Sequence, residues 1–191
     1  MFISYKRLFF DLFSPVLCTA LLFTLSFSTD KVHAESSPSS QVNHLPNDFD
    51  ENDLQVLQDI ITLNNLELDP LDLGEQAWSN ERLVYLDISN NYELTTLPDN
   101  FGELEMLVEL NLDGNNLTSL PVTLFDLSQL GNLSIRQNQL ASLPEFLPDS
   151  LSITGLDIAY NYITSLPVSF GNFSNLLTLN LSHNQISELP E

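Results

Sequence analysis

From Leu83 onward, apolar positions recur along the chain with a period of 23 or 24 residues. The segment LVYLDISNNYELTTLP is followed in register by LVELNLDGNNLTSLP, LGNLSIRQNQLASLP, ITGLDIAYNYITSLP and LLTLNLSHNQISELP. These copies begin at Leu83, Leu107, Leu130, Ile153 and Leu176. Within each copy, L-x-L alternates with a period of two, which predicts a short strand with apolar side chains inward. Five copies in a row predict a solenoid of stacked parallel strands.

These residues resemble the leucine-rich-repeat family, whose pattern is L-x-x-L-x-L-x-x-N-x-L, in the form of about 23 residues that continues x-x-L-P-x-x-Φ. The resemblance covers residues 83–191 and implies an α/β-type repeat solenoid. The expected architecture is a leucine-rich-repeat horseshoe with a short parallel sheet on the concave face and an N-terminal helical cap. The repeats run over 83–106, 107–129, 130–152 and 153–175, and an incomplete repeat covers 176–191.

Two further columns follow each predicted strand. The asparagine column is Asn91, Asn115, Asn138, Asn161 and Asn184. Where the chain turns away from the sheet it leaves backbone groups buried, and an amide side chain offers them both a donor and an acceptor. We therefore expect a structural asparagine ladder. Apolar residues on the return side should close the core, namely Phe101, Leu124, Leu147 and Phe170. The third repeat departs from the others there, at Pro148 and Ser150.

Residues 53–82 are predicted to cap the front of the solenoid. In DLQVLQDIITLNN, apolar residues fall on one helical face, and Asn52 or Asp53 can cap the first turn. The apolar positions of this face are Leu54, Leu57, Ile60 and Ile61. Leu68, Leu71 and Leu73 fit L-x-x-L-x-L once more, which suggests a degenerate half-repeat with Trp78 covering the first strand.

The N-terminus has the features of an export signal. Lys6 and Arg7 precede an apolar run over 15–27, and a small-residue cleavage pattern ends at Ala34. We therefore expect residues 1–34 to be a cleaved signal peptide and residues 35–52 to be a flexible acidic linker. The only cysteine, Cys18, lies in the signal, so the exported protein contains no disulfide. A disulfide-free repeat protein of this kind points to a bacterial source. It should be secreted, periplasmic or on the cell surface, without membrane insertion after cleavage.

Charge restricts the choice of partners. The chain has 26 Asp and Glu against 5 Lys and Arg, a formal net charge of -21. Such a surface repels nucleic acid and anionic lipid, because phosphate binding needs clustered basic residues. Beyond the signal, only Arg82 and Arg136 are basic.

No catalytic or cofactor pattern emerges, and we expect a protein that is not an enzyme and binds no cofactor. His183 beside Ser182 is the only histidine in the repeats, and neighbouring strand residues face different ways. Asp48, Asp50, Asn52 and Asp59 have the oxygen spacing of a calcium loop, but Asp53 stands where that loop needs glycine. An acidic helix N-terminus is the alternative interpretation, and we predict no metal site.

The outward strand positions form the candidate binding surface. Those expected to bind a partner are Tyr85, Asp87, Glu109, Asn111, Asp113, Arg136, Asp157, Tyr160 and His183. The same outward set contains Asn132, Ser134, Gly155, Ala159, Thr178 and Asn180. Tyr and Arg are enriched at binding hot spots, although Arg136 and Asp113 could simply form a surface salt bridge. The expected function is therefore binding of a protein or peptide on the concave face.

Two alternatives concern the chain as a whole. The repeats could be the recognition half of a larger or truncated protein whose effector or enzymatic domain is not in this sequence. The fifth repeat also lacks a return segment, which would leave apolar flanks uncovered at Leu179, Leu181, Ile186 and Leu189. A solenoid end needs a polar cover, so this end could mediate end-to-end self-association.

Overall fold

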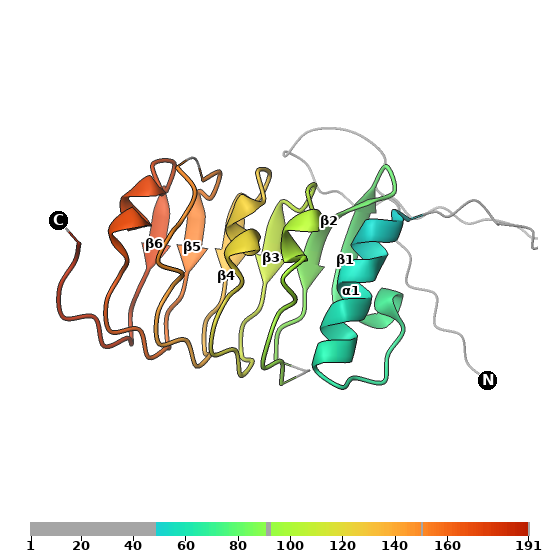
Figure 1. The fold of residues 1–191 in the computed structure, drawn as a ribbon, viewed down its shortest axis with the longest axis horizontal. Helices are drawn as coiled ribbons and strands as arrows, with labels where there is room; N and C mark the ends of the chain where they lie inside the picture. Colours follow the sequence, from blue (N-terminus) through green and yellow to red (C-terminus); the bar gives the residue numbers. More distant parts are fainter. Residues whose placement is uncertain (1–48, 91–92, 150, 191) are drawn as a thin grey trace, which may run out of the picture. The chain divides into compact units, whose positions relative to one another are not determined.

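The computed structural model describes residues 49–90, 93–149 and 151–190. The predicted signal peptide, most of the predicted linker and Asn91 lie outside these residues. The described residues form one six-stranded sheet in the order β1-β2-β3-β4-β5-β6 (Figure 1). The strands are β1 (Glu75–Ser79), β2 (Arg82–Asp87), β3 (Glu109–Asn111), β4 (Asn132–Ser134), β5 (Gly155–Asp157) and β6 (Thr178–Asn180). Sheet order follows chain order because each repeat stacks on the one before it.

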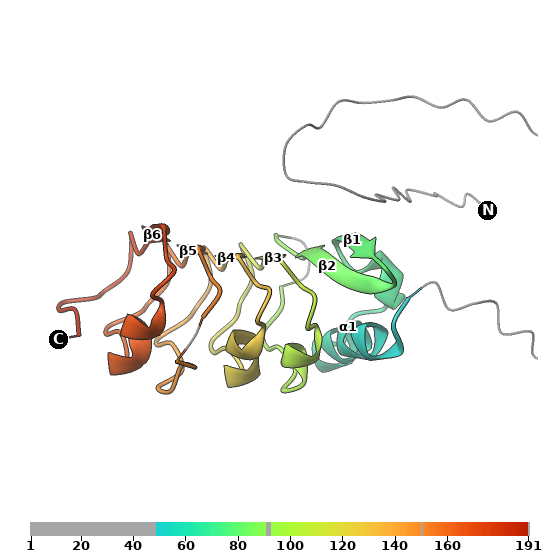
Figure 2. The same ribbon diagram turned by 90° about the horizontal axis from the view of Figure 1, so that it is seen from above.

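Strands β2 to β6 pair in parallel, with equivalent repeat positions side by side. Leu86 pairs with Leu110, and the register continues through Leu133, Leu156 and Leu179. The sheet lines one side of the solenoid, and the return segments with their 3₁₀ helices lie on the other (Figure 2). The predicted repeat solenoid with a parallel sheet and an N-terminal helical cap is confirmed.

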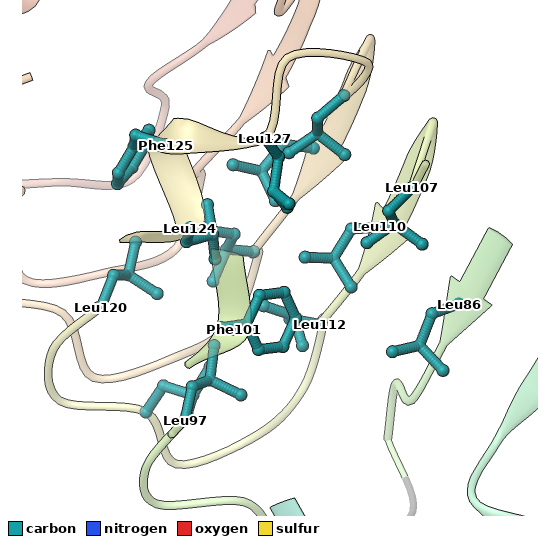
Figure 3. Close-up of a cluster of buried hydrophobic side chains, with 14 of the residues drawn as sticks. Leu86, Leu97, Phe101, Leu107, Leu110, Leu112, Leu120, Leu124, Phe125 and Leu127 are labelled. Carbon is teal, nitrogen blue, oxygen red and sulfur yellow. The ribbon is translucent and has the colours of Figure 1, made fainter. Parts of the chain in front are cut away.

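The core lies between the sheet and the return segments. Leu86 and Leu110 enter it from the strands, whereas Phe101 and Leu124 enter it from the opposite side (Figure 3). All four side chains are fully or almost fully buried. Burying such a side chain contributes about 1.5–3 kcal/mol, so each repeat is stabilised mainly by its own few apolar residues and by those of its neighbours.

The return segments contain short 3₁₀ helices in three of the four described repeats that reach this region. They are η2 (Phe101–Glu103), η3 (Val122–Asp126) and η4 (Val168–Asn172). In the third repeat, the described residues at this place form no helix. Pro148 explains the difference, because proline lacks the N–H of a helical hydrogen bond and restricts the preceding Leu147. Leu147 and Leu151 nevertheless remain buried.

Helix α1 (Glu51–Leu63) begins earlier than the sequence predicts. Its N-cap is Asp50, whose side chain accepts hydrogen bonds from the backbone N–H groups of Asn52 and Asp53. The expectation of a cap at Asn52 or Asp53, with a linker extending to residue 52, was therefore wrong. The buried face of the helix includes Val56, whereas Leu54 is only partly buried.

Asp53 instead forms a buried ion pair that joins α1 to the first repeat. Both of its oxygens accept hydrogen bonds from the Arg82 guanidinium, each at 2.9 Å, and its Oδ2 also accepts the backbone N–H of Leu83 at 2.7 Å. The side chain of Asp53 is fully buried. Hydrogen bonding to Asp53 is the main reason why the pKa of Arg82 is raised. One of the two arginines beyond residue 34 thus holds the cap in place.

The predicted half-repeat is a different structure. Leu68 and Leu71 are 36% and 37% exposed, so they do not point into the core as repeat leucines would. Only Leu73 is buried. Residues 70–72 form the 3₁₀ helix η1 (Pro70–Asp72), and β1 then pairs antiparallel with β2. Two positive-φ residues, Asn80 and Glu81, turn the chain between these strands, which is typical of a tight hairpin.

The hairpin covers the front edge of the parallel sheet, where an open strand would expose unpaired backbone groups. Trp78 is partly buried against the core, as expected, and its ring lies 4.6 Å from that of Phe49 in an edge-on contact. Phe49 therefore belongs to the cap.

At the other end, the apolar residues of the fifth repeat are unevenly covered. Leu179 is 43% exposed and Leu189 is 68% exposed, whereas the equivalent Leu156 and Leu166 are 3% and 7% exposed. Leu181 and Ile186 remain partly buried against the core. End-to-end association through this surface stays a prediction, which light scattering can check.

Candidate functional site

The outward face of β2–β6, called the sheet face below, presents its side chains in four rows across the repeats. The first row is Tyr85, Glu109, Asn132, Gly155 and Thr178. The second row is Asp87, Asn111, Ser134, Asp157 and Asn180. The third row is Ser89, Asp113, Arg136, Ala159 and Ser182, and the fourth is Asn90, Gly114, Gln137, Tyr160 and His183. All nine predicted binding residues fall in these rows.

Side chains of the second row fix the backbone where each strand ends. Asp87 Oδ1 accepts the N–H of Ser89, and Asn111 Oδ1 accepts the N–H of Asp113. The row is also joined sideways, because Asn111 Nδ2 donates to Asp87 Oδ2 at 3.0 Å. Asp157 and Asn180 repeat both kinds of contact. These polar side chains are therefore ordered before any ligand arrives, which lowers the entropy cost of binding.

In the third repeat the second-row residue is Ser134, and the backbone N–H two residues later bonds to Asp113 of the preceding repeat instead. Asp113 Oδ1 accepts hydrogen bonds from Ser134 Oγ and from the backbone N–H of Arg136, each at 2.7 Å. The serine side chain is shorter than that of Asp or Asn, so it does not reach the backbone N–H two residues further on as they do. The carboxylate predicted as a partner for the Arg136 charge is thus engaged with other groups.

The Arg136 guanidinium turns toward the following repeat. Its Nε lies 3.8 Å from Asp157 Oδ2, and its Cζ lies 5.9 Å from the centre of the Tyr160 ring. The expected Arg136–Asp113 ion pair was therefore wrong, and Asp157 is the partner. On the other face of Tyr160, the His183 ring stacks at 4.1 Å with an interplanar angle of 12°. Arg136, Tyr160 and His183 form a continuous stack along the strand ends.

The fourth row owes its position to an unusual backbone. Each of its residues has a positive φ, between 53° and 65°. Gly114 has this conformation without strain, and a Cβ atom there would lie 2.0 Å from Asn90 Oδ1. Tyr160 adopts the same conformation while its N–H donates to the Ser182 carbonyl at 3.0 Å, and His183 adopts it with its ring stacked on Tyr160.

One residue of the predicted outward set is not exposed. Ala159 is fully buried, although its row-mates lie at or near the surface. The Ser182–His183 pair also has no catalytic arrangement. Ser182 Oγ donates to Asn180 Oδ1 at 2.8 Å, while the His183 ring lies on Tyr160.

Across β3–β6 the sheet face is hollowed. The hollow has a volume of about 390 Å³ and is lined by all three residues of each of these four strands. Its outward-facing lining comes from the first two rows, so it includes the predicted Glu109, Asn111 and Asp157. Asn132, Gly155 and Thr178 line it as well, and they are absent from the predicted binding residues although strand register already placed them outward.

Gly155 deepens the centre of the hollow. A Cβ atom at this position would lie 2.5 Å from Asn132 Oδ1 and 3.2 Å from Thr178 Oγ1. The Asn132 side chain therefore leans over the space that any other residue would fill. Asn132 and Thr178 are both exposed, and they present amide and hydroxyl groups on either side of the glycine.

The front end of the sheet face carries a concentration of negative charge. The pKa of Tyr85 is raised, first by partial burial and then by the charges of Asp87, Glu109 and Glu75. The phenol of Tyr85 also lies 3.5 Å from Asp87 Oδ2.

Beneath the sheet face, the ladder asparagines lie in the interior. Asn115, Asn138 and Asn161 are 4–5% exposed. Asn115 Oδ1 accepts the N–H of Leu94, and its Nδ2 donates to the carbonyls of Ile88 and Leu112. Asn138, Asn161 and Asn184 make corresponding contacts. These side chains support the site and are inaccessible to a ligand.

Among residues 49–90, 93–149 and 151–190, no three His, Cys, Asp or Glu side chains gather in a way that could hold a metal ion. Of residues 48–59, which have the oxygen spacing of a calcium loop, 51–59 are helical, and Asp59 accepts hydrogen bonds from Gln55 and Asn100. Asp48 lies outside the described residues. Within the same described residues, no helix has the length and apolar character needed to span a bilayer.

Comparisons with known proteins agree with this architecture. Two family models, both described as leucine rich repeat, match residues 81–140 and 175–191. The leucine-rich repeat domain of the type III effector XopL is 30% identical, with a TM-score of 0.52 over 56% of this chain and 39% of its own. A leucine-rich-repeat protein of Leptospira interrogans is 25% identical, with a TM-score of 0.51 over 71% and 41%.

A plant ice-binding protein is 26% identical, with a TM-score of 0.59 over 74% of this chain and 50% of its own. The chain thus spans half or less of the length of these three structures. No match to a curated protein was found.

Proposed function

Because the chain belongs to the leucine-rich-repeat family, we propose that it is a binding module that holds a protein or peptide on its sheet face. The hollow across β3–β6 carries this proposal. It combines four strands in one continuous surface, and the side chains around it are ordered by hydrogen bonds to each other and to the backbone.

The composition of the face favours a macromolecular ligand over a small molecule. The hollow is open along the strands, and carboxylate, amide and hydroxyl groups line it together with one leucine from each strand. Sites for small molecules are usually enclosed and mostly apolar. Tyr160 is 42% exposed beside Arg136, and these residue types often dominate the energy of protein interfaces.

A random peptide library displayed on phage tests the proposal. Peptides selected on the immobilised protein should bind less well to Arg136→Ala and Tyr160→Ala, with unchanged melting midpoints. Glu103→Ala is the control, because Glu103 lies in η2 on the return side. Equal losses from Glu103→Ala would place the binding surface elsewhere, and a failure to select any peptide dependent on the sheet face would count against the function.

We also propose that the protein is exported. The support comes from Lys6, Arg7, the apolar run 15–27 and the cleavage pattern ending at Ala34. The alternative in which the repeats are the recognition part of a larger protein is supported by the type III effector XopL, in which the leucine-rich repeats form one domain. Sequencing the transcript beyond the codon for Glu191 tests that alternative directly.

A further inference from the structure

We infer that the hollow binds an extended peptide segment that carries lysine or arginine side chains. This inference rests on the proposed function and specifies the ligand. It depends on three features of the sheet face: its charge, the state of its one guanidinium and the form of the hollow.

The charge of the sheet face favours a cationic ligand. Its four rows contain the carboxylates Asp87, Glu109, Asp113 and Asp157 and a single guanidinium, Arg136. Glu109 lines the hollow, is exposed, and has no hydrogen bond or ion pair among the described residues. Opposite charges across an interface guide encounter and select partners, so a cationic side chain is the natural partner of this carboxylate.

Arg136 is the single guanidinium of the sheet face, and it does not line the hollow. Its side chain is 43% exposed, and its buried Nε lies 3.8 Å from Asp157 Oδ2 without a hydrogen bond. An anionic ligand in the hollow would therefore meet the carboxylates of Glu109 and Asp157, which do line it. The pKa of Tyr85 is raised first by burial and then by the charges of Asp87, Glu109 and Glu75, so these carboxylates disfavour a further negative charge at the front of the face.

The hollow has the dimensions of a short extended segment. It crosses four strands, and strands lie about 4.8 Å apart, so three spacings give about 14 Å. An extended chain advances about 3.3 Å per residue, which places roughly four residues in the hollow. The amide of Asn132 and the hydroxyl of Thr178 flank Gly155, where they can bond to the main chain of such a segment.

The experiment must separate binding in the hollow from general attraction, because a protein with a net charge of -21 attracts any polycation. Three fluorescent peptides of equal length are titrated against the purified protein at one ionic strength. They alternate serine with lysine, serine with glutamate, and serine with threonine. We expect the lysine peptide to bind most tightly.

Two matched pairs of variants locate the binding. Gly155→Val fills the hollow, and the side-chain ends of Asn132 and Thr178 must give way. The control Gly171→Val has no neighbour within 4 Å and lies in η4 on the return side. Both variants keep the net charge of the protein. Gly155→Val should therefore lower the affinity for the lysine peptide by about tenfold or more, and Gly171→Val should leave it unchanged. Glu109→Gln should weaken it about two- to fivefold, and the control Glu145→Gln, exposed on the return side, should not. Melting midpoints verify that each variant is folded.

The outcomes distinguish this inference from the function on which it rests. The lysine peptide could bind Gly155→Val as tightly as Gly171→Val, and Glu109→Gln as tightly as Glu145→Gln. Its attraction to the protein would then be non-specific, and the inference would be overturned. If the glutamate or threonine peptide binds more tightly and loses affinity in Gly155→Val, the hollow is a binding site but its ligand is not cationic. If no peptide responds to Gly155→Val or Glu109→Gln, both the inference and peptide binding in the hollow fail.

Discussion

The amide of Asn138 accepts a hydrogen bond from the N–H of Leu117 and donates to the carbonyl of Leu112, both in the preceding repeat. It also donates to the carbonyl of Arg136 in its own turn. One side chain therefore satisfies three backbone groups and ties two repeats together. The sequence predicted this role because an amide offers both a donor and an acceptor at a buried turn, which an apolar side chain does not.

Replacing a buried ladder asparagine should lower the free energy of unfolding far more than replacing the exposed asparagine beside it. Asn115→Leu leaves the N–H of Leu94 and the carbonyl of Ile88 without the amide that bonds to them, and each loss costs about 1–3 kcal/mol. The carbonyl of Leu112 still accepts a hydrogen bond from Asn138. We expect a destabilisation of about 3 kcal/mol or more in urea unfolding. The control is Asn116→Leu, whose side chain makes one exposed bond to Gln139. Similar losses for the two variants would show that the buried amide is not what stabilises the turn.

The ionisation of Tyr85 offers a second test at this scale. Burial and three nearby carboxylates raise its pKa, so the folded state favours the neutral phenol. The resulting stabilisation is present below the unfolded value of about 10 and is lost as pH rises through the higher folded value. The difference between alkaline absorbance titrations of the wild type and Tyr85→Phe isolates this group. A midpoint at or below the ordinary tyrosine value would contradict the described environment.

At the scale of elements, the repeats were predictable and the cap only in part. Five copies in register define the strands, because each copy repeats the same alternation and the same buried column. The cap occurs once, so no repetition identifies its boundaries. Asp50 and Asp53 are both plausible caps by residue type, and only the position of Arg82 in three dimensions decides between them. The leucines at 68 and 71 fit the repeat spacing without taking the repeat conformation.

Rows across the sheet face were predictable for the same reason as the strands. The direction of the Arg136 side chain was not, because two carboxylates, Asp113 and Asp157, lie on either side of it in the sequence pattern. The choice depends on Ser134, whose short side chain draws Asp113 into backbone contacts. The role of Gly155 in the hollow could not be predicted, because it depends on how closely the side chains of Asn132 and Thr178 approach it in the structure.

The ion pair between α1 and β2 should stabilise the cap. Asp53→Asn removes the buried charge that binds Arg82 and Leu83, and we expect a loss of about 2–4 kcal/mol in chemical unfolding. Asp72→Asn in η1 is an exposed control with the same change of residue. A cycle with Arg82→Met should show strong coupling to Asp53→Asn. Additive effects of the two changes would mean that the pair contributes nothing as a pair.

For the whole molecule, the predicted export has a direct chemical test. If residues 1–34 are a signal peptide, mass spectrometry of the protein from outside the cytoplasm should find Glu35 as the first residue. The mature form would then contain no cysteine and would not react with thiol reagents. Recovery of an exported form that retains Cys18 would contradict this cleavage.

The shared register of β2–β6 makes each repeat a unit that can be copied. A duplicate of residues 107–129 inserted after residue 129 would meet, on both sides, the same kind of leucine column and the same asparagine contacts that the original meets. Such an insertion would lengthen the sheet by one strand, or about 4.8 Å, and its core residues would pack against the same types of residues as in the original repeat. A gene of this form can therefore grow or shrink by unequal recombination, and its product can acquire a longer binding surface in a single genetic event.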